Sequence, residues 1–214
     1  MSDEDGENAH GVRHVGGIAG YGEAADVLAA QYEEVTFDEV HRDVLHRVPA
    51  EPGRILDVGA GTGRDAAALT ALGHDVVAVE PTAELRAHGQ RLHPGAAIEW
   101  VDDALPDLSL IGPIEHFDAV FATAVWMHLN APERRRAMAR TGELLAPGGL
   151  LFLTLRHGPV PEGRQMFEVS TAETVALGAE LGLRTIHTSE RPDLHGRNSV
   201  HWSCLVLERP KLTP

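Results

Sequence analysis

Residues 54–69 read RILDVGAGTGRDAAAL. The apolar run Ile55–Val58 predicts a short buried strand, and the alanine-rich segment that begins near Gly63 predicts a helix. Gly59 and Gly61 lie in the turn between them. Because glycine has no Cβ atom, a ligand can approach the backbone of such a turn closely. The free N–H groups at the start of the following helix favour an anionic or polar group there, so this stretch predicts a strand, a ligand-binding turn and a helix.

Two carboxylates accompany the turn. Asp57 lies at the end of the first predicted strand, and Glu80 directly follows the next apolar run, Val76–Val79. In a doubly wound fold, a carboxylate at the end of the second strand can accept hydrogen bonds from the hydroxyls of a ribose. The two acids therefore extend the prediction from a general ligand turn to a nucleoside site.

Over about residues 53–156 the chain resembles the class I S-adenosylmethionine-dependent methyltransferases. The segments that carry the resemblance are Asp57-x-Gly59-x-Gly61-x-Gly63, Glu80, Phe117–Val120 and Leu145–Leu150. In that family the first motif holds the methionine moiety of the cofactor, the acid after the second strand holds its ribose, and a carboxylate after the third strand lies near its adenine. The resemblance implies S-adenosylmethionine as cofactor and S-adenosylhomocysteine as product.

The resemblance also implies which residues bind the cofactor, all of them at or just after the carboxyl ends of the first four strands. They are Asp57, Gly59, Ala60, Gly61, Gly63, Glu80, Pro81, Asp102, Asp103 and Thr123. Asp102 and Asp103 compete for the adenine, and only one should point inward because neighbours on an extended chain face opposite ways. Asp65, in the first helix, receives no function and is interpreted as a surface acid.

The rest of the chain fits one layered domain. Strands and helices alternate through its middle, which is typical of a parallel sheet covered on both faces. Residues 184–189 and 199–207 form two extended runs with no helix between them, so they should pair as an antiparallel hairpin. We therefore expect an α/β, doubly wound, Rossmann-like sheet of seven strands with a final antiparallel strand and helices on both faces. The remaining strands are predicted at 75–79, 98–101, 117–123 and 150–155, and the helices of this region at 63–72, 83–92 and 131–145.

Composition divides the chain into three parts. Residues 1–16 are polar and are expected to be disordered, residues 17–52 supply amino-terminal helices that in this family often close over the site, and residues 53–214 form the methyltransferase core. Residues 23–34 have helical periodicity. A capping box at 36–39 predicts a second helix, with an apolar face formed by Phe37, Val40, Val44 and Val48. Another capping box, Ser170–Glu173, opens a later helix.

The segment Thr123–Leu129 leaves the fourth strand at the edge where open α/β sheets bind ligands. It lacks the Asn/Asp-Pro-Pro-Tyr pattern of amide or adenine N-methylation and the Pro-Cys pair of cytosine C5 methylation. His128 is a candidate general base, since the ordinary pKa of histidine lies near neutral pH; a packing role is the alternative. Trp126 and Met127 are expected to wall the pocket.

Two loops near the carboxyl terminus are rich in cations, and in this topology both emerge above the cofactor. They carry Arg156, His157, Arg164, Arg191, His195 and Arg197. One hypothesis is an electropositive rim that attracts an acceptor bearing a carboxylate or phosphate. The alternative is chance clustering, neutralised by neighbouring acids. The predicted acceptor-binding residues are Tyr21, Trp126, Arg156, Arg164 and Arg197.

The composition of the chain limits which kinds of binding partner are expected. The chain has 32 acidic and 18 basic residues and a net charge of −14, which argues against a general nucleic-acid partner. Cys204 is the single cysteine, and the histidine spacings fit no metal site. No signal segment or membrane span is evident, so a cytoplasmic enzyme with a small-molecule acceptor is expected. The acceptor atom (O, N, S or C) and the oligomeric state stay open.

Two other classes of function share parts of this pattern. A nicotinamide-dependent oxidoreductase also has the glycine turn and the ribose acid, but its G-x-G-x-x-G fingerprint requires a glycine where Arg64 stands. A catalytically silent member of the fold, acting as a cofactor sensor or assembly partner, would have the same sequence features.

Overall fold

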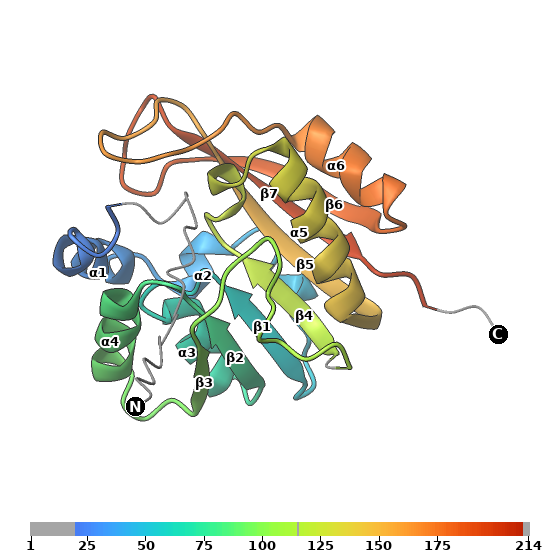
Figure 1. Ribbon diagram of the computed structural model, residues 1–214, viewed down its shortest axis with the longest axis horizontal. Coiled ribbons are helices and arrows are strands. Elements are labelled where there is room, and N and C mark those ends of the chain that lie inside the picture. Colours follow the sequence, from blue (N-terminus) through green and yellow to red (C-terminus); the bar gives the residue numbers. More distant parts are fainter. Residues whose placement is uncertain (1–19, 115, 212–214) are drawn as a thin grey trace, which may run out of the picture.

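The computed structural model describes residues 20–114 and 116–211. Its centre is a seven-stranded sheet in the order β3-β2-β1-β4-β5-β7-β6, shown in Figure 1. Neighbouring strands from β3 to β5 are parallel, whereas β7 is antiparallel to both β5 and β6. The predicted fold class is confirmed. The strands are β1 Arg54–Val58, β2 Asp75–Val79, β3 Ile98–Val101, β4 Phe117–Ala122, β5 Leu145–His157, β6 Arg184–Pro192 and β7 His201–Glu208.

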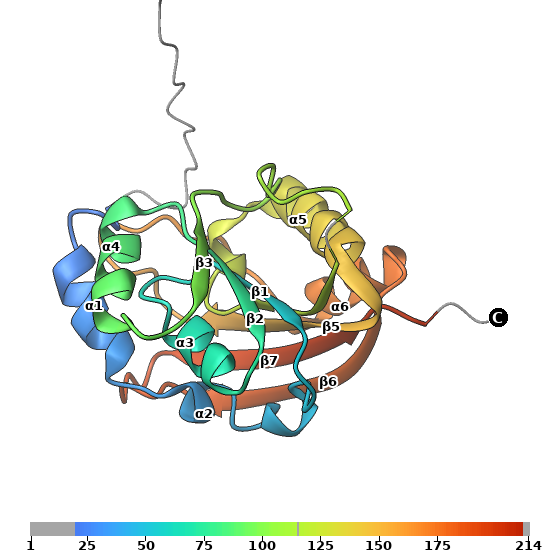
Figure 2. The same ribbon diagram turned by 90° about the horizontal axis from the view of Figure 1, so that it is seen from below.

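Helices cover both faces of the sheet, as Figure 2 shows. They are α1 Ala25–Glu33, α2 Phe37–Val40, α3 Arg64–Ala71, α4 Ala83–Leu92, α5 Ala131–Leu144 and α6 Thr171–Glu180, with short 3-10 turns η2 Leu45–Arg47 and η3 Trp126–His128. Successive strand residues alternate between two cores: Leu56 packs with the α5 and α6 side, and Ile55 with the α2 and α3 side. This alternation is what a sheet buried on both faces requires.

The carboxyl ends of β1, β2 and β4 meet at one edge of the sheet. Val58 pairs with Val79, and the backbone N–H groups of Gly59 and Ala60 both donate to the Val79 carbonyl, at 2.7 and 3.0 Å. These two hydrogen bonds fold the glycine turn across the end of β2. The turn is therefore placed directly beside Glu80, the first residue after that strand.

The amino-terminal helices differ in part from the prediction. The capping box forms: Thr36 Oγ1 accepts from the Glu39 N–H at 3.2 Å, and the Thr36 N–H donates to Glu39 at 2.8 Å. The expected helix through Val48 is wrong, because α2 ends at Val40 and the chain turns before η2. His41, which follows α2, is 1% exposed, and its Nε2 lies 2.8 Å from Asp65 Oδ2. This buried contact draws the chain inward and ends the helix.

The second predicted capping box forms only in half. The Ser170 hydroxyl accepts from the Glu173 N–H at 3.1 Å, as predicted. The Glu173 carboxylate instead accepts from Arg134 Nε and Nη2, at 2.9 and 2.7 Å. Arg134 is 5% exposed, and a buried guanidinium needs a charged partner. The interhelical ion pair therefore takes the place of the reciprocal cap.

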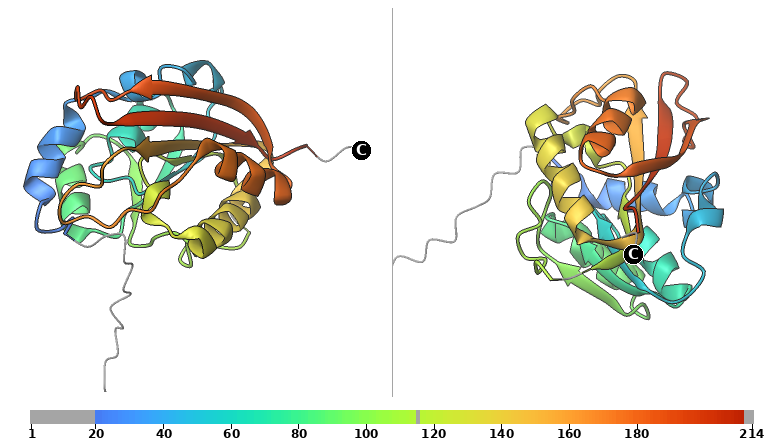
Figure 3. Two further views of the ribbon diagram at one scale, coloured as in Figure 1. Left: turned by 90° about the horizontal axis from the view of Figure 1, so that it is seen from above. Right: turned by 90° about the vertical axis from the view of Figure 1, so that its right-hand side faces the viewer.

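The helix α1 confirms the predicted helix at 23–34 and packs beside α4 at the carboxyl edge of the sheet, as the left view of Figure 3 shows. The predicted disordered tail, residues 1–16, lies outside the described residues, and the division into 17–52 and 53–214 stays a prediction. Over the ranges 20–114 and 116–211, none of the helices combines the length and apolar character needed to cross a membrane. Cys204 is a buried free thiol.

Candidate functional site

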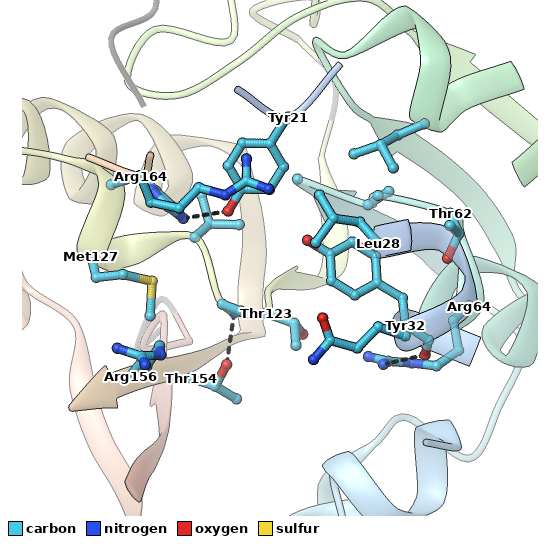
Figure 4. Close-up of a pocket in the computed structure, with 18 of the residues that line it drawn as sticks. Tyr21, Leu28, Tyr32, Thr62, Arg64, Thr123, Met127, Thr154, Arg156 and Arg164 are labelled. Atoms are coloured by element: carbon cyan, nitrogen blue, oxygen red, sulfur yellow. Dashed lines mark hydrogen bonds between the residues drawn. The ribbon is translucent and has the colours of Figure 1, made fainter. Parts of the chain in front are cut away.

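A cavity of about 500 Å³ lies at the carboxyl edge of the sheet. Its walls come from α1, the glycine turn, the residues after β2 and β4, and the two carboxyl-terminal loops (Figure 4). The predicted site residues that line it are Tyr21, Asp57, Gly59, Ala60, Gly61, Glu80, Pro81, Thr123, His128, Arg156, Arg164 and Arg197. The fold thus gathers residues from Tyr21 to Arg197 around one space.

Glu80 is a buried carboxylate at the mouth of the glycine turn. It is 5% exposed, and its two oxygens accept from the Gly61 N–H at 2.9 Å and the Thr82 N–H at 2.8 Å. Burial raises its pKa, and the hydrogen bonds from Thr82 and Gly61 oppose the rise. Each carboxylate oxygen has a second lone pair. Glu80 therefore keeps acceptor capacity for a ligand in the cavity.

Asp57 is 2% exposed, and its Oδ2 is buried with no hydrogen-bond partner within the described ranges. Burial, together with the nearby charge of Asp65, raises the pKa of Asp57 well above its usual range. Leaving a buried polar atom unpaired costs free energy unless a ligand supplies the partner. Asp57 lines the cavity, so a hydrogen-bond donor or a cation on a ligand would satisfy it.

Asp65 was expected at the surface, and this expectation is wrong. It is 4% exposed. Its Oδ2 lies 2.8 Å from His41 Nε2 and accepts from the Thr123 hydroxyl at 3.0 Å. Its Oδ1 accepts from Nε and Nη2 of Arg64, both at 2.8 Å. Burial opposes ionisation, but the charges of Arg64 and His41 hold the pKa of Asp65 well below its ordinary value. The one sequence signal was its position four residues before the buried Leu69, on the same helix face.

At two of the three turn glycines, a side chain would collide with the protein's own packing. A Cβ atom on Gly59 would lie 2.4 Å from Val125 Cγ2, and one on Gly63 would lie 2.8 Å from the Trp100 ring. Gly63 does not line the cavity. All three glycines, including Gly61, have positive φ angles of 58 to 76°, which other residues adopt only with strain. The turn is thus specific for glycine for conformational as well as steric reasons.

The two acids after β3 do not line the cavity. Asp102 is 66% exposed and accepts from Arg86 Nη2 at 2.8 Å. Asp103 points inward, as one of the pair was predicted to, but it accepts from the N–H groups of Ala104 at 2.9 Å and Leu110 at 2.6 Å. Asp103 therefore holds its own loop in place. Ala104 and Leu105 form this part of the cavity wall instead.

Of the two residues expected to wall the acceptor side, only Met127 lines the cavity. Trp126 is fully buried in the core between the sheet and α5. Both residues lie in the 3-10 turn η3 and are buried in the same core, but only Met127 also reaches the cavity wall. Trp126 is therefore a core residue in this structure.

His128 faces Tyr21. Its Nδ1 lies 2.9 Å from the Gln165 carbonyl, and its Nε2 lies 3.0 Å from the Tyr21 hydroxyl. A carbonyl only accepts, so we assign the ring proton to Nδ1 and an acceptor lone pair to Nε2. Burial lowers the pKa of His128, as do the charges of Arg164 and Arg156. His128 is thus a neutral imidazole whose basic nitrogen is on the cavity side.

Five of the six cations predicted around the opening line the cavity: Arg156, Arg164, Arg191, His195 and Arg197. The exception is His157, whose Nε2 lies 2.8 Å from the Ser203 hydroxyl and whose ring stacks on His201. Asp193 accepts two parallel hydrogen bonds from Arg197: Nε donates to Oδ2 at 2.9 Å, and Nη2 donates to Oδ1 at 2.7 Å. Burial opposes ionisation of Asp193, but the hydrogen bonds from Arg197 and Trp202 hold its pKa well below the usual value.

Three of these arginines form no ion pair among the described residues. Arg164 lies over the Tyr21 ring, with its Cζ 3.8 Å from the ring centroid (Figure 4), and its Nη1 is buried with no hydrogen-bond partner among residues 20–114 and 116–211. Arg156 donates to the Pro159 carbonyl at 2.8 Å. Arg191 donates to the Pro192 carbonyl at 3.4 Å. None of the three has a carboxylate within ion-pair distance in the part of the chain that the structure describes.

Comparison with known proteins agrees with this geometry. A family model described as a methyltransferase domain matches residues 55–149. An uncharacterised methyltransferase of Bacillus cytotoxicus is 26% identical over 168 residues, which cover 77% of this chain and 67% of that protein. A ubiquinone biosynthesis O-methyltransferase of Xylella fastidiosa is 34% identical over 115 residues, covering 52% and 45%. The chain spans about half to two thirds of the length of the curated relatives it matches.

Solved structures show the same fold. A TehB-like S-adenosylmethionine-dependent methyltransferase from Corynebacterium glutamicum aligns with a TM-score of 0.65 at 20% identity, covering 87% of this chain and 98% of that one. The 1,6-didemethyltoxoflavin-N1-methyltransferase of Burkholderia thailandensis, with bound 1,6-didemethyltoxoflavin and S-adenosylhomocysteine, aligns with a TM-score of 0.61 at 22% identity, covering 88% and 90%. The chain therefore matches a methyltransferase domain over residues 55–149 and shares the fold of these solved methyltransferases.

Proposed function

We propose that this protein transfers a methyl group from S-adenosylmethionine to a small-molecule acceptor that carries a carboxylate or phosphate, and releases S-adenosylhomocysteine. The observation that carries the proposal is that one cavity joins two halves of opposite charge. Asp57 and Glu80 line its donor half, and Arg156, Arg164 and Arg191 line its other half without carboxylate partners among the described residues.

The donor half fits the cofactor. The unpartnered oxygen of Asp57 and the turn at Gly61 suit a cationic, hydrogen-bonding group, and the remaining lone pairs of Glu80 suit a diol. Pro81 and Leu105 supply apolar wall for a flat base. When bound, the cofactor supplies an activated methyl carbon for an in-line displacement. The protein then has to hold the acceptor in line and keep water out.

Charge supports an anionic acceptor. In a protein with a net charge of −14, three unpaired arginines on one cavity wall focus a positive potential there. Guanidinium groups bind carboxylates and phosphates through two parallel hydrogen bonds. Arg197 already donates two hydrogen bonds to Asp193, so we assign it a structural role at the cavity opening. We assign the contacts with the acceptor to Arg156 and Arg164.

His128 is proposed as the general base. Gln165 holds its Nδ1 proton, so Nε2 is free to accept a proton from an acceptor O–H or N–H group. In this structure the Tyr21 hydroxyl forms a hydrogen bond with His128 Nε2. The methyl acceptor would replace the hydroxyl as the partner of this nitrogen. The lowered pKa of His128 keeps the ring neutral near pH 7, which a base requires.

The alternatives receive less support. A nicotinamide-dependent oxidoreductase is not favoured, since the family model and the relatives are methyltransferases. A silent cofactor sensor needs no arginine wall or neutral histidine facing the cavity. The Burkholderia structure holds a small molecule together with S-adenosylhomocysteine, which supports a small-molecule acceptor on this fold.

A labelled-methyl screen over a metabolite extract tests the proposal. We expect transfer to an anionic small molecule, with kcat/KM falling as salt is raised. Arg156→Ala and Arg164→Ala should each raise KM by about tenfold or more and leave S-adenosylhomocysteine affinity within about twofold. Arg135→Ala is the control, because Arg135 is exposed and pairs with Glu180 on α6. No labelled product, or an uncharged preferred acceptor with salt-independent kinetics, would contradict the proposal.

A further inference from the structure

Two arginines flank a tryptophan across the three strands that reach the arginine-rich half of the cavity. Trp202 on β7 pairs directly with Arg156 on β5 and with Arg191 on β6. Residues that pair directly across strands point to the same face of a sheet, with Cβ atoms about 4.5–5.5 Å apart. All three residues line the cavity. The sheet therefore presents a row of cation, indole and cation to the cavity, which we call the Arg–Trp–Arg row.

The indole of Trp202 is held in place by two of its neighbours. Its Nε1 donates to Asp193 Oδ1 at 2.9 Å, and Asp193 is 8% exposed. The guanidinium carbon of Arg191 lies over the ring, 5.5 Å from its centroid, which is within the range of a cation–π contact. Trp202 is nevertheless only half-buried and lines the cavity. Because its N–H group is already satisfied, the indole offers a ligand π surface and not a hydrogen bond.

Two methionines extend this apolar surface. Met127 and Met166 line the same cavity, and both belong with Trp202 to the apolar core cluster on the α5 side of the sheet. The Phe167 N–H donates to the Met127 carbonyl at 2.7 Å, which ties the segment that carries Met166 to η3. Thioether side chains fill irregular gaps and pack against the edges of aromatic rings. This wall therefore suits a flat apolar body better than a compact, fully hydrated anion.

Arg156 is placed to bind an anionic group attached directly to such a body. It donates to the Pro159 carbonyl at 2.8 Å and has no carboxylate within ion-pair distance in the described part of the chain. Because Arg156 and Trp202 are direct cross-strand neighbours, an anion on the guanidinium brings the atoms bonded to it alongside the indole. A carboxylate on an aromatic ring can lie in the plane of that ring, so both fit flat along the Arg–Trp–Arg row. A tetrahedral phosphate has no such plane.

We infer that the methyl acceptor is an aromatic carboxylate, whose carboxylate binds Arg156 and whose ring packs against Trp202 and the two methionines. This inference rests on the proposed function and deepens it, from small anions in general to planar aryl acids. His128 directly follows Met127 in η3, so a hydroxyl or amino group on the same aromatic ring can reach the proposed base. Trp202 is then the residue that selects planar acids over saturated ones.

Matched ligands separate the contribution of the ring from that of the charge in the unaltered protein. The strongest binder among 2-, 3- and 4-hydroxybenzoate is compared by calorimetry with its saturated analogue, the corresponding hydroxycyclohexanecarboxylate, and with its uncharged amide. Each is titrated into protein saturated with S-adenosylhomocysteine. The aromatic acid should bind about fivefold or more tightly than the saturated acid, and about tenfold or more tightly than the amide.

Two substitutions at Trp202 then isolate the indole. Trp202→Phe and Trp202→Leu both lose the hydrogen bond to Asp193, but only the phenylalanine variant keeps an aromatic surface. Trp202→Phe should retain the preference for the aromatic over the saturated acid, and Trp202→Leu should reduce it to less than about twofold. Arg156→Ala should remove the preference for the acid over the amide and keep the preference for the aromatic ring.

Three results would overturn the inference: a saturated acid that binds the wild type as well as the aromatic one, the same loss of preference in Trp202→Phe and Trp202→Leu, or hydroxybenzoates that do not bind at millimolar concentration. The proposed function would still stand if the labelled-methyl screen gave an aliphatic or phosphorylated product. A protein that neither binds S-adenosylhomocysteine nor labels any acceptor would overturn both.

Discussion

Removing the charge of Glu80 should selectively weaken the nucleoside part of cofactor binding. The carboxylate is 5% exposed and already accepts from two backbone N–H groups, Gly61 and Thr82. The ribose would add two more charge-assisted hydrogen bonds. Such bonds contribute about 1.5–3 kcal/mol each, against about 0.5–1.5 kcal/mol for neutral ones. Two ligand bonds that each lose about 1 kcal/mol give a loss of about 2 kcal/mol, or roughly 30-fold in Kd.

The choice of substitution follows from the same contacts. Glu80→Ala would leave two buried N–H groups unpaired, at about 1–3 kcal/mol each, so its effect on binding would be mixed with a loss of stability. Glu80→Gln keeps the shape and one acceptor oxygen, and is therefore the cleaner variant. Glu84→Gln, at an exposed acid in the first turn of α4, is the matched control and should bind S-adenosylhomocysteine as the wild type does.

Calorimetry with S-adenosylhomocysteine and with its 2′-deoxyribose analogue completes the test. The analogue should bind the wild type about tenfold more weakly, and the Glu80→Gln protein should discriminate less between the two ligands. Thermal unfolding reports whether each variant is folded. If Glu80→Gln is folded and binds both ligands within about twofold of the wild type, the assignment of Glu80 to the ribose is wrong.

Two further predictions concern protons. Burial raises the pKa of Asp57 in the free protein, and an ammonium partner would lower this pKa in the complex. Binding should therefore release a proton. The affinity for S-adenosylhomocysteine should then rise with pH, by at most about tenfold per pH unit, until the pH reaches the pKa of Asp57 in the free protein. Calorimetry in buffers of different ionisation enthalpy measures this release, and Asp57→Asn should abolish it. The Tyr21 hydroxyl donates to His128 and stabilises the neutral ring, so Tyr21→Phe should raise the pKa of His128; a fall in an NMR titration would refute the assigned tautomer.

The sheet could be predicted because its signals are local. The apolar runs that became β2 and β3 are bounded by polar or turn residues, and their ends match the prediction at both sides. The predicted length of α2 is wrong because a contact between residues far apart in the sequence ends the helix. Its capping box and apolar spacing both favour a longer helix, but His41 finds Asp65, a partner 24 residues away. Tertiary contact overrides local propensity where a buried charge needs a partner.

The site residues divide in the same way, into those placed by local signals and those placed by tertiary contacts. Asp57, Glu80 and Thr123 could be placed in the cavity because they follow strands whose ends share one edge. Asp103 and Trp126 could not be placed, since each sits where the chain leaves regular structure and its direction depends on loop contacts. Position along an element predicts which edge a residue occupies. It does not predict which way a side chain turns beyond the end of that element.

The two halves of the cavity differ in charge and come from different parts of the chain. The donor half comes from β1, β2 and the turns that follow them, where buried carboxylates outnumber the single arginine, Arg64. The opposite half comes from the end of β5 and the segment after it, which bring Arg156 and Arg164 to the space beside His128. Under the proposed function, the first half would attract the cationic methyl donor and the second half would attract the anionic acceptor. Because opposite potentials separate oppositely charged ligands before any specific contact forms, the proposed function needs only this one cavity to orient donor and acceptor.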